Sequence, residues 1–246
     1  MQLTNLTNQT DVIITHPDVV FYDFYAAWDE PIESDKQAYL SNRTGILAQA
    51  APNIGPMLWE EIPGADGITR QLQWTARVEG DSAFTNSTHA MTISQYLGRG
   101  QVSRGRATIT GSLGMTVSTQ PFLHNDGDKA AVVAGIKNMQ DSLKGIQGLE
   151  WVRPKANQTA EAYVDSLLVT ANGRRANHWM GTAKMGTDDG SAGGTAVVDT
   201  NAKVYGTDNI FVLDASVFPG QLTGNPSATI VIAAEHAAAK ILALGS

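Results

Sequence analysis

Two segments of this 246-residue chain hold the side chains best suited to proton transfer. His178 lies in the segment Asn177-His178-Trp179, and Asn225 lies further along the chain, directly before Pro226. An imidazole exchanges protons near neutral pH, and a carboxamide both donates and accepts hydrogen bonds. Taken alone, a single histidine is more often structural than catalytic. The main prediction from the sequence is therefore that the two segments meet in space.

A long apolar helix is predicted to begin at Pro226 and to end near Leu244. Proline suits the first helical position because its φ is already fixed and its missing N–H is not needed there. Asn225 is in turn a favoured N-cap residue. The free N–H groups and the positive dipole at such a helix end attract a phosphate, a carboxylate or an electron-rich ring. The junction therefore predicts a binding site for an electronegative group.

Other kinds of catalytic site leave no signature in the sequence. Cysteine is absent, which excludes disulfides and thiolate metal ligands. The remaining histidines lack the spacing of a zinc site, and no serine lies in a G-x-S-x-G segment. No G-x-G-x-x-G loop follows a predicted strand. Adjacent acids occur at Glu60-Glu61 and Asp188-Asp189, and such neighbours are more often solvated than catalytic.

Charge and composition argue against two classes of partner. The formal net charge is −7 and 17% of the residues are charged, whereas nucleic-acid binding needs clustered lysine and arginine. No uninterrupted apolar run approaches the roughly 20 residues that cross a membrane. Triplets of the N-glycosylation pattern N-x-[ST] favour secretion, although no signal peptide is visible at Met1. These triplets begin at Asn5, Asn8, Asn42, Asn86 and Asn157.

The pattern of apolar residues predicts an α+β fold, in which an antiparallel sheet of about six strands carries helices on one face. Strands are predicted over residues 11–15, 70–78, 91–97 and 102–109. Helices are predicted over residues 128–143, with Asp126 or Asp128 as the N-cap, and over residues 159–168. Near residue 180 the sequence becomes rich in Gly, Asp and Ser, which predicts a second structural unit. Short strands are predicted there over residues 197–198, 204–205 and 210–213.

Three motifs in this tail resemble the C-terminal half of a glucose-methanol-choline (GMC) flavin oxidoreductase. They are N-H-W-M-G-T-A-K-M-G from Asn177, V-V-D-T-N-A-K-V-Y-G-T-D-N-I-F-V-L-D-A-S-V-F-P from Val197, and T-G-N-P-S-A-T-I-V-I-A-A-E-H-A-A-A from Thr223. Within that family, segments that begin at Pro17, Tyr39, Tyr96 and Ser103 resemble the dehydrogenase part of the fungal cellobiose dehydrogenases. The resemblance assigns residues 1–180 to a substrate-binding domain. It assigns residues 181–246 to the C-terminal strand-helix fragment of a Rossmann-like FAD domain.

The resemblance implies a hydride transfer to FAD from the anomeric carbon of cellobiose or a related oligosaccharide, which becomes the lactone. His178 would take the hydroxyl proton, and Asn225 would hydrogen-bond the same hydroxyl. Further sugar contacts are implied for Asn177, Arg77 and Tyr96. Cofactor contacts are implied for Asp214, Ala215, Asn225 and Pro226, with the helix end at the pyrimidine edge of the flavin.

The resemblance also implies missing partners. The N-terminal Rossmann unit with its Gly-rich loop is absent from the sequence, as is the haem domain of the complete cellobiose enzymes. We expect this chain alone to hold FAD weakly or not at all, and to need the other half of the FAD domain for activity. The alternative function is a cofactor-free carbohydrate-binding module. Arg77 and Tyr96 each have a structural alternative to sugar binding. Arg77 would form a surface ion pair, and Tyr96 would fill a half-buried strand position.

Overall fold

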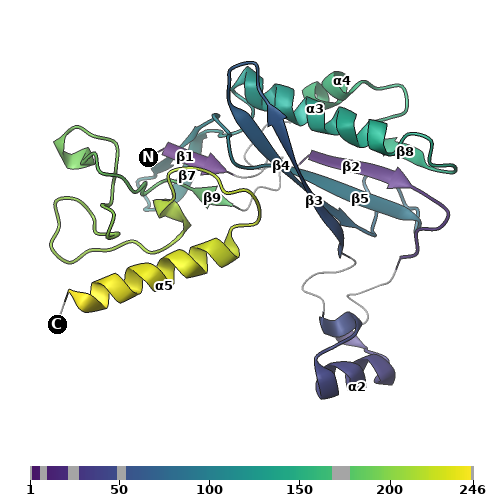
Figure 1. The fold of residues 1–246 in the computed structure, drawn as a ribbon, viewed down its shortest axis with the longest axis horizontal. Helices are drawn as coiled ribbons and strands as arrows, with labels where there is room; N and C mark the ends of the chain where they lie inside the picture. The colour runs from purple at the N-terminus through teal and green to yellow at the C-terminus, as the bar shows by residue number, and fades with distance from the viewer. Residues whose placement is uncertain (1, 6–9, 22–27, 49–53, 168–177, 245–246) are drawn as a thin grey trace.

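The computed structural model describes residues 2–5, 10–21, 28–48, 54–167 and 178–244, which Figure 1 shows as ribbon. The strands are β1 (Gln2–Asn5), β2 (Thr10–Thr15), β3 (Ile54–Pro63), β4 (Thr69–Arg77), β5 (Ala90–Leu97), β6 (Gly105–Ile109), β7 (Met115–Thr119), β8 (Glu150–Arg153) and β9 (Trp179–Met180). The α-helices are α2 (Glu33–Asn42), α3 (Asp126–Ser142), α4 (Ala160–Ser166) and α5 (Ser227–Ala243). Short 3-10 helices are η1 (Ile46–Ala48), η2 (Gly190–Ala192) and η3 (Ala215–Val217).

The larger sheet is antiparallel and has five strands in the order β3-β4-β5-β2-β8. The predicted strands over residues 11–15, 70–78 and 91–97 are confirmed as β2, β4 and β5. Helices α3 and α4 cover one face of this sheet (Figure 1), and alternate apolar side chains of the strands pack against them. The buried core there includes Val12, Leu72, Trp74, Ile93, Leu97, Val132 and Ile136.

The opposite face of the same sheet carries polar side chains on strands β4 and β5. Strand alternation places Gln73, Thr75 and Arg77 of β4 on this face, beside Ser94 and Tyr96 of β5. Gln73 is paired directly with Tyr96, and Thr75 is paired with Ser94. On these two strands, this face therefore presents hydrogen-bonding side chains, whereas the helix-covered face presents mostly apolar side chains.

The single sheet predicted from the sequence is wrong, because the strand predicted over residues 102–109 does not join β5. Strand β6 belongs instead to a second antiparallel sheet of four strands, in the order β7-β6-β1-β9. The cause is the segment before β6, where the N–H groups of Val102 and Ser103 donate to the carboxylate of Asp128 and not to a neighbouring strand. The chain leaves the first sheet after Leu97 through a turn in which the Gln101 N–H donates to the Gly98 carbonyl at 3.2 Å, and β6 pairs with β1 and β7.

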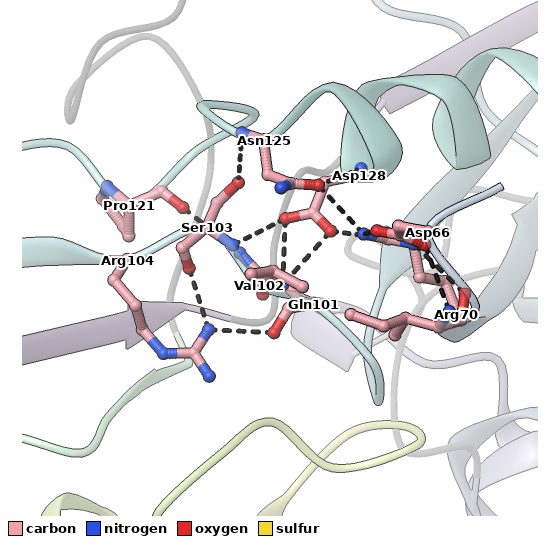
Figure 2. Close-up of polar contacts among 10 residues, drawn as sticks. Asp66, Arg70, Gln101, Val102, Ser103, Arg104, Pro121, Asn125 and Asp128 are labelled. Carbon is pink, nitrogen blue, oxygen red and sulfur yellow. Dashed lines mark hydrogen bonds and ion pairs between the residues drawn. The ribbon is translucent and has the colours of Figure 1, made fainter. Parts of the chain in front are cut away.

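Asp128 belongs to a buried polar network that Figure 2 shows. Arg70 Nε donates to Asp128 Oδ1 at 2.6 Å, and Arg70 Nη2 donates to Asp66 Oδ2 at 2.8 Å and to Asn125 Oδ1 at 2.9 Å. The side chains of Arg70 and Asp128 have no solvent exposure. Ser103 Oγ accepts the N–H of Asn125 at 3.1 Å. The network therefore joins β4, the segment before β6 and the start of α3.

The predicted N-cap of α3 is also wrong, since the capping residue is Asn125 and neither Asp126 nor Asp128. The Asn125 side chain accepts the N–H of Asp128 at 3.1 Å, while the carboxylate of Asp128 is already bound to Arg70 and to backbone N–H groups. Helix α4 begins close to the predicted start at residue 159, and its N-cap is Thr159, whose Oγ1 accepts the N–H of Ala162 at 3.1 Å.

The C-terminal segment contains fewer strands than the sequence predicts. The strands expected over residues 197–198, 204–205 and 210–213 are reduced to isolated bridges such as Val198 with Val204 and Lys203 with Phe211. Tight turns prevent longer pairing: Asp199 Oδ1 accepts the N–H groups of both Asn201 and Lys203. The Rossmann-like origin of this segment and the boundary near residue 180 stay predictions. Within the described ranges, no helix has both the length and the apolar character needed to cross a membrane.

Candidate functional site

The structure brings His178 and Asn225 together, as the sequence predicts. His178 Nε2 lies 3.1 Å from Asn225 Oδ1. His178 directly precedes β9, and Asn225 directly precedes Pro226 at the start of α5. Because a carbonyl oxygen only accepts, this contact requires the imidazole proton to be on Nε2. If the proton is on Nδ1 instead, Nε2 becomes a base beside a carboxamide.

The expected role of Asn225 as the N-cap of α5 is wrong. The N-cap is Pro226, with φ −86° and ψ −11°, and no side chain caps the helix. The reason is competition, since the Asn225 side chain contacts His178 and its backbone N–H contacts Gln73. The first turn of α5 also holds no acidic residue. The N–H groups and dipole at this helix end therefore remain for an external electronegative group.

His178 is held by the short strand that follows it. Strand β9 pairs with β1, so that Met180 lies opposite Thr4, and Met180 is buried. The ring of Trp179 packs against Phe122 with centroids 6.2 Å apart. The His178 carbonyl accepts a hydrogen bond from Gln221 Nε2 at 3.3 Å. The side chain of Trp179, which follows His178, and the backbone of His178 are therefore both held in place.

Asn225 is held against the polar face of the larger sheet. Its N–H donates to Oε1 of Gln73, a residue of β4 with 2% exposure, at 3.1 Å. Two glycines allow this close approach: a Cβ on Gly224 would lie 2.6 Å from Gln73 Oε1, and a Cβ on Gly98 would lie 2.5 Å from the Leu222 carbonyl. The loop before α5 is therefore seated directly on β4 and on the end of β5.

A cavity of about 360 Å³ lies beside Asn225. Its lining residues are Met57, Trp59, Gln73, Thr223, Gly224 and Asn225. The side chains of Met57 and Trp59 are about half exposed. Sequence reasoning missed β3 altogether, and with it these two residues. The sequence there shows no alternation of apolar and polar residues, although Met57, Trp59 and Glu61 pair with the polar positions of β4.

The sugar-binding roles expected for Arg77 and Tyr96 stay predictions, and the two residues have different surroundings. Arg77 Nε lies 2.6 Å from Glu79 Oε1, and its Nη1 donates to Ser94 Oγ at 3.2 Å, so the ion-pair alternative describes its contacts. Tyr96 is half-buried opposite Gln73 in the register, and burial raises the pKa of its hydroxyl. Tyr96 therefore occupies the strand position nearer to Asn225, because it pairs with Gln73, whose side chain contacts the Asn225 backbone.

The remaining candidate residues lie on the C-terminal side of the site. Asp214 caps η3, because its Oδ1 accepts the N–H of Ser216 at 2.8 Å, and Ala215 opens that helix. The chain after His178 is tied to the same turn, where the Ala183 N–H donates to the Ser216 carbonyl at 2.9 Å. The cofactor contacts expected for Asp214 and Ala215 stay predictions. Asn177 lies outside the described residues.

The family pattern described as GMC oxidoreductase matches residues 101–234, which is more than half of the chain. The chain belongs to the GMC oxidoreductase family.

The chain is also similar to individual proteins and solved structures. Versicolorin B synthase of Emericella nidulans is 32% identical over 218 residues, which are 85% of this chain and 32% of the relative. The structure of a formate oxidase superposes over 98% of this chain and 46% of its own, with a TM-score of 0.71 and 17% identity. An FAD-dependent oxidoreductase from Chaetomium thermophilum superposes over 96% of this chain and 47% of its own, with a TM-score of 0.62 and 19% identity. The chain thus spans about a third of that curated relative and less than half of these structures.

Proposed function

We propose that this chain forms the substrate side of an FAD-dependent GMC oxidoreductase that oxidises a sugar at its anomeric carbon. The substrate is cellobiose or a related oligosaccharide, and the product is the lactone. The contact of 3.1 Å between His178 Nε2 and Asn225 Oδ1 carries the proposal, because it places an imidazole and a carboxamide at one point, where the imidazole can act as a base once a substrate hydroxyl replaces Asn225 Oδ1 at Nε2. The sugar substrate rests on the upstream segments that resemble cellobiose dehydrogenases.

In the reaction, the anomeric C–H bond and the hydroxyl O–H bond break, and the C=O bond of the lactone forms. His178, with its own proton on Nδ1, accepts the hydroxyl proton at Nε2. Asn225 donates from its Nδ2 to the hydroxyl oxygen and so orients the O–H bond toward the imidazole. FAD, when bound, supplies the acceptor for the hydride.

Residues of this chain also fit one edge of such a cofactor. The start of α5 has no capping side chain and no acidic residue in its first turn, so its dipole favours the negative charge that reduced flavin acquires. The polar sheet face supplies hydroxyl groups for a polyhydroxylated ligand, among them those of Thr75 and Tyr96. We further propose that a separate FAD-binding unit, in the same molecule or in a partner, completes the site. A haem domain as electron acceptor and a secreted location belong to the same proposal.

The test measures turnover of cellobiose with a dye acceptor by the FAD-loaded protein, that is, this chain together with the FAD-binding unit that completes the site, and His178→Gln is the inactive variant. Dye reduction with lactone formation that is lost in His178→Gln supports the proposal. Oxidation of choline or another alcohol without oxidation of any sugar rejects the substrate but keeps the reaction class. Cellobiose binding without any flavin or dye reduction rejects the oxidoreductase and favours a carbohydrate-binding module.

A further inference from the structure

Two buried glutamine side chains contact the backbone of the His178–Asn225 pair, one at each residue of the pair. Gln73 on β4 has 2% exposure, and Gln221 in the loop before α5 has 9%. Gln73 Oε1 accepts the Asn225 N–H at 3.1 Å, and Gln221 Nε2 donates to the His178 carbonyl at 3.3 Å. Sequence reasoning gives no role to either glutamine.

The chemistry of the backbone determines which end of each amide faces the pair. The Asn225 N–H can only donate, so the oxygen of Gln73 must face it. The His178 carbonyl can only accept, so the nitrogen of Gln221 must face it. Gln73 is fixed further, because its Nε2 donates to Thr75 Oγ1 at 3.0 Å. Each glutamine therefore has one orientation that satisfies its contact.

The Asn225 backbone also has a particular need for this acceptor. Its N–H precedes Pro226, which has no N–H of its own, and the helix begins only at Ser227. An N–H held against a sheet without an acceptor would lose its hydrogen bond to water and gain none in its place, which destabilises that position of the loop. Gly224 has no side chain to hold the Gln73 oxygen away, since a Cβ there would approach it to 2.6 Å. Gln73 thus determines where the backbone of Asn225 lies on the sheet.

We propose that Gln73 and Gln221 are positioning residues that set the distance between His178 Nε2 and Asn225 Oδ1. Gln73 fixes Asn225 from strand β4 of the larger sheet. Gln221 fixes His178 from the loop that precedes α5. The kinetic consequence rests on the proposed function. The geometric consequence does not, because the contact of the pair exists without substrate.

The kinetic test compares Gln73→Met, which has similar volume and no strong acceptor, with Gln73→Glu, which keeps an acceptor oxygen. In the FAD-loaded protein we expect Gln73→Met to lower kcat by about 10- to 100-fold with KM changed less than about threefold, as for a misplaced catalytic group. We expect Gln73→Glu to recover most of the loss. The matched control is Gln71→Met on the same strand face, whose amide contacts Glu61 and Arg99.

The geometric test measures which nitrogen of the His178 imidazole carries the proton, and it needs no enzymatic turnover. In protein labelled with ¹⁵N in histidine, at a pH where imidazole is neutral, the wild type should show His178 with its proton on Nε2 because Asn225 Oδ1 accepts it. Gln73→Met should shift His178 toward a mixture of tautomers, and Gln71→Met should not. If the tautomer shifts while the wild type oxidises no alcohol, the positioning role stands and the proposed function fails.

An unchanged tautomer and an unchanged kcat in Gln73→Met would overturn the proposal. So would a lowered melting temperature with the wild-type tautomer, since this outcome would reduce Gln73 to a purely structural residue. If Gln73→Met does not fold by circular dichroism, Gln221→Met answers the same question from the histidine side. It should change the tautomer and lower kcat in the same way, and a wild-type result for both readings would reject the proposal.

Discussion

Arg70 Nε lies 2.6 Å from Asp128 Oδ1, and both side chains are fully buried. This ion pair links the elements around the site. Asp128 accepts the Ser103 N–H in the segment before β6, while Arg70 ties β4 to the start of α3. Three positions further along β4, Gln73 contacts Asn225. The strand that anchors the candidate catalytic loop is thus itself anchored by the buried arginine.

We expect Arg70→Met to destabilise the protein by about 3–5 kcal/mol, because it leaves the carboxylate of Asp128 buried without its partner. The measurement is the free energy of unfolding in urea. The control is Arg99→Met, which breaks the exposed pair of Arg99 with Glu61 and should cost less than about 1 kcal/mol. Similar costs for the two variants would show that the buried network contributes no more than a surface pair.

The same network predicts an acid-sensitive contribution to stability. The hydrogen bond from Arg70 lowers the pKa of Asp66 from 3.8 to about 2. Since the folded state has the lower pKa, the contribution is complete above about pH 3.8 and is lost as the pH falls toward 2. We expect the stability difference between wild type and Asp66→Asn to shrink between pH 5 and pH 2.5 in urea unfolding. A difference that is independent of pH would contradict this assignment.

The sequence predicts those elements whose apolar pattern is set by the core. Strands β2, β4 and β5 and helices α3 and α4 are found close to their expected positions, because their buried faces repeat with the period of a strand or a helix. Strand β3 was missed because it is a sheet edge with exposed apolar side chains such as Met57 and Trp59. The sequence of β3 therefore lacks the alternation of apolar and polar residues that marks a strand with one buried face.

The details of the site depend on competition between tertiary contacts, which no local pattern records. Asn225 has the residue type of an N-cap, yet its carboxamide contacts His178 from a distant part of the chain. Strand β6 has the pattern of a neighbour of β5, yet the Asp128 carboxylate binds the backbone before it. The types of His178 and Asn225 could be recognised, whereas Gln73 has no signal apart from its place on a strand.

For the pair itself, we expect Asn225→Ala to lower kcat by about 100-fold in the FAD-loaded protein, because the hydroxyl loses the group that orients it. KM should change less, since a sugar makes its other contacts elsewhere. The measurement is steady-state oxidation of cellobiose with a dye acceptor. Asn209→Ala, at an exposed asparagine of the same segment, is the control. An equal loss in both variants would remove Asn225 from the proposed mechanism.

The close approach at Gly224 gives the sharpest structural prediction. A Cβ at this position would lie 2.6 Å from Gln73 Oε1 and 3.5 Å from Trp59 Nε1, so Gly224→Ala must displace either the loop or the Gln73 amide. Because Asn225 is the next residue, we expect kcat to fall by about tenfold or more, with a modest loss of stability.

Gly220→Ala is the matched control, since a Cβ there meets no atom within 4 Å and the residue lies in the same loop. Its activity should stay within about twofold of wild type, as expected for a surface change away from the site. Combining Gly224→Ala with Gln73→Ala removes the side chain that the new methyl group meets, while leaving Asn225 without its acceptor. If the loop position matters through the Gln73 contact, the double variant should be no more active than Gly224→Ala alone. Full recovery in the double variant would instead mean that steric conflict, and not the lost hydrogen bond, limits the single variant.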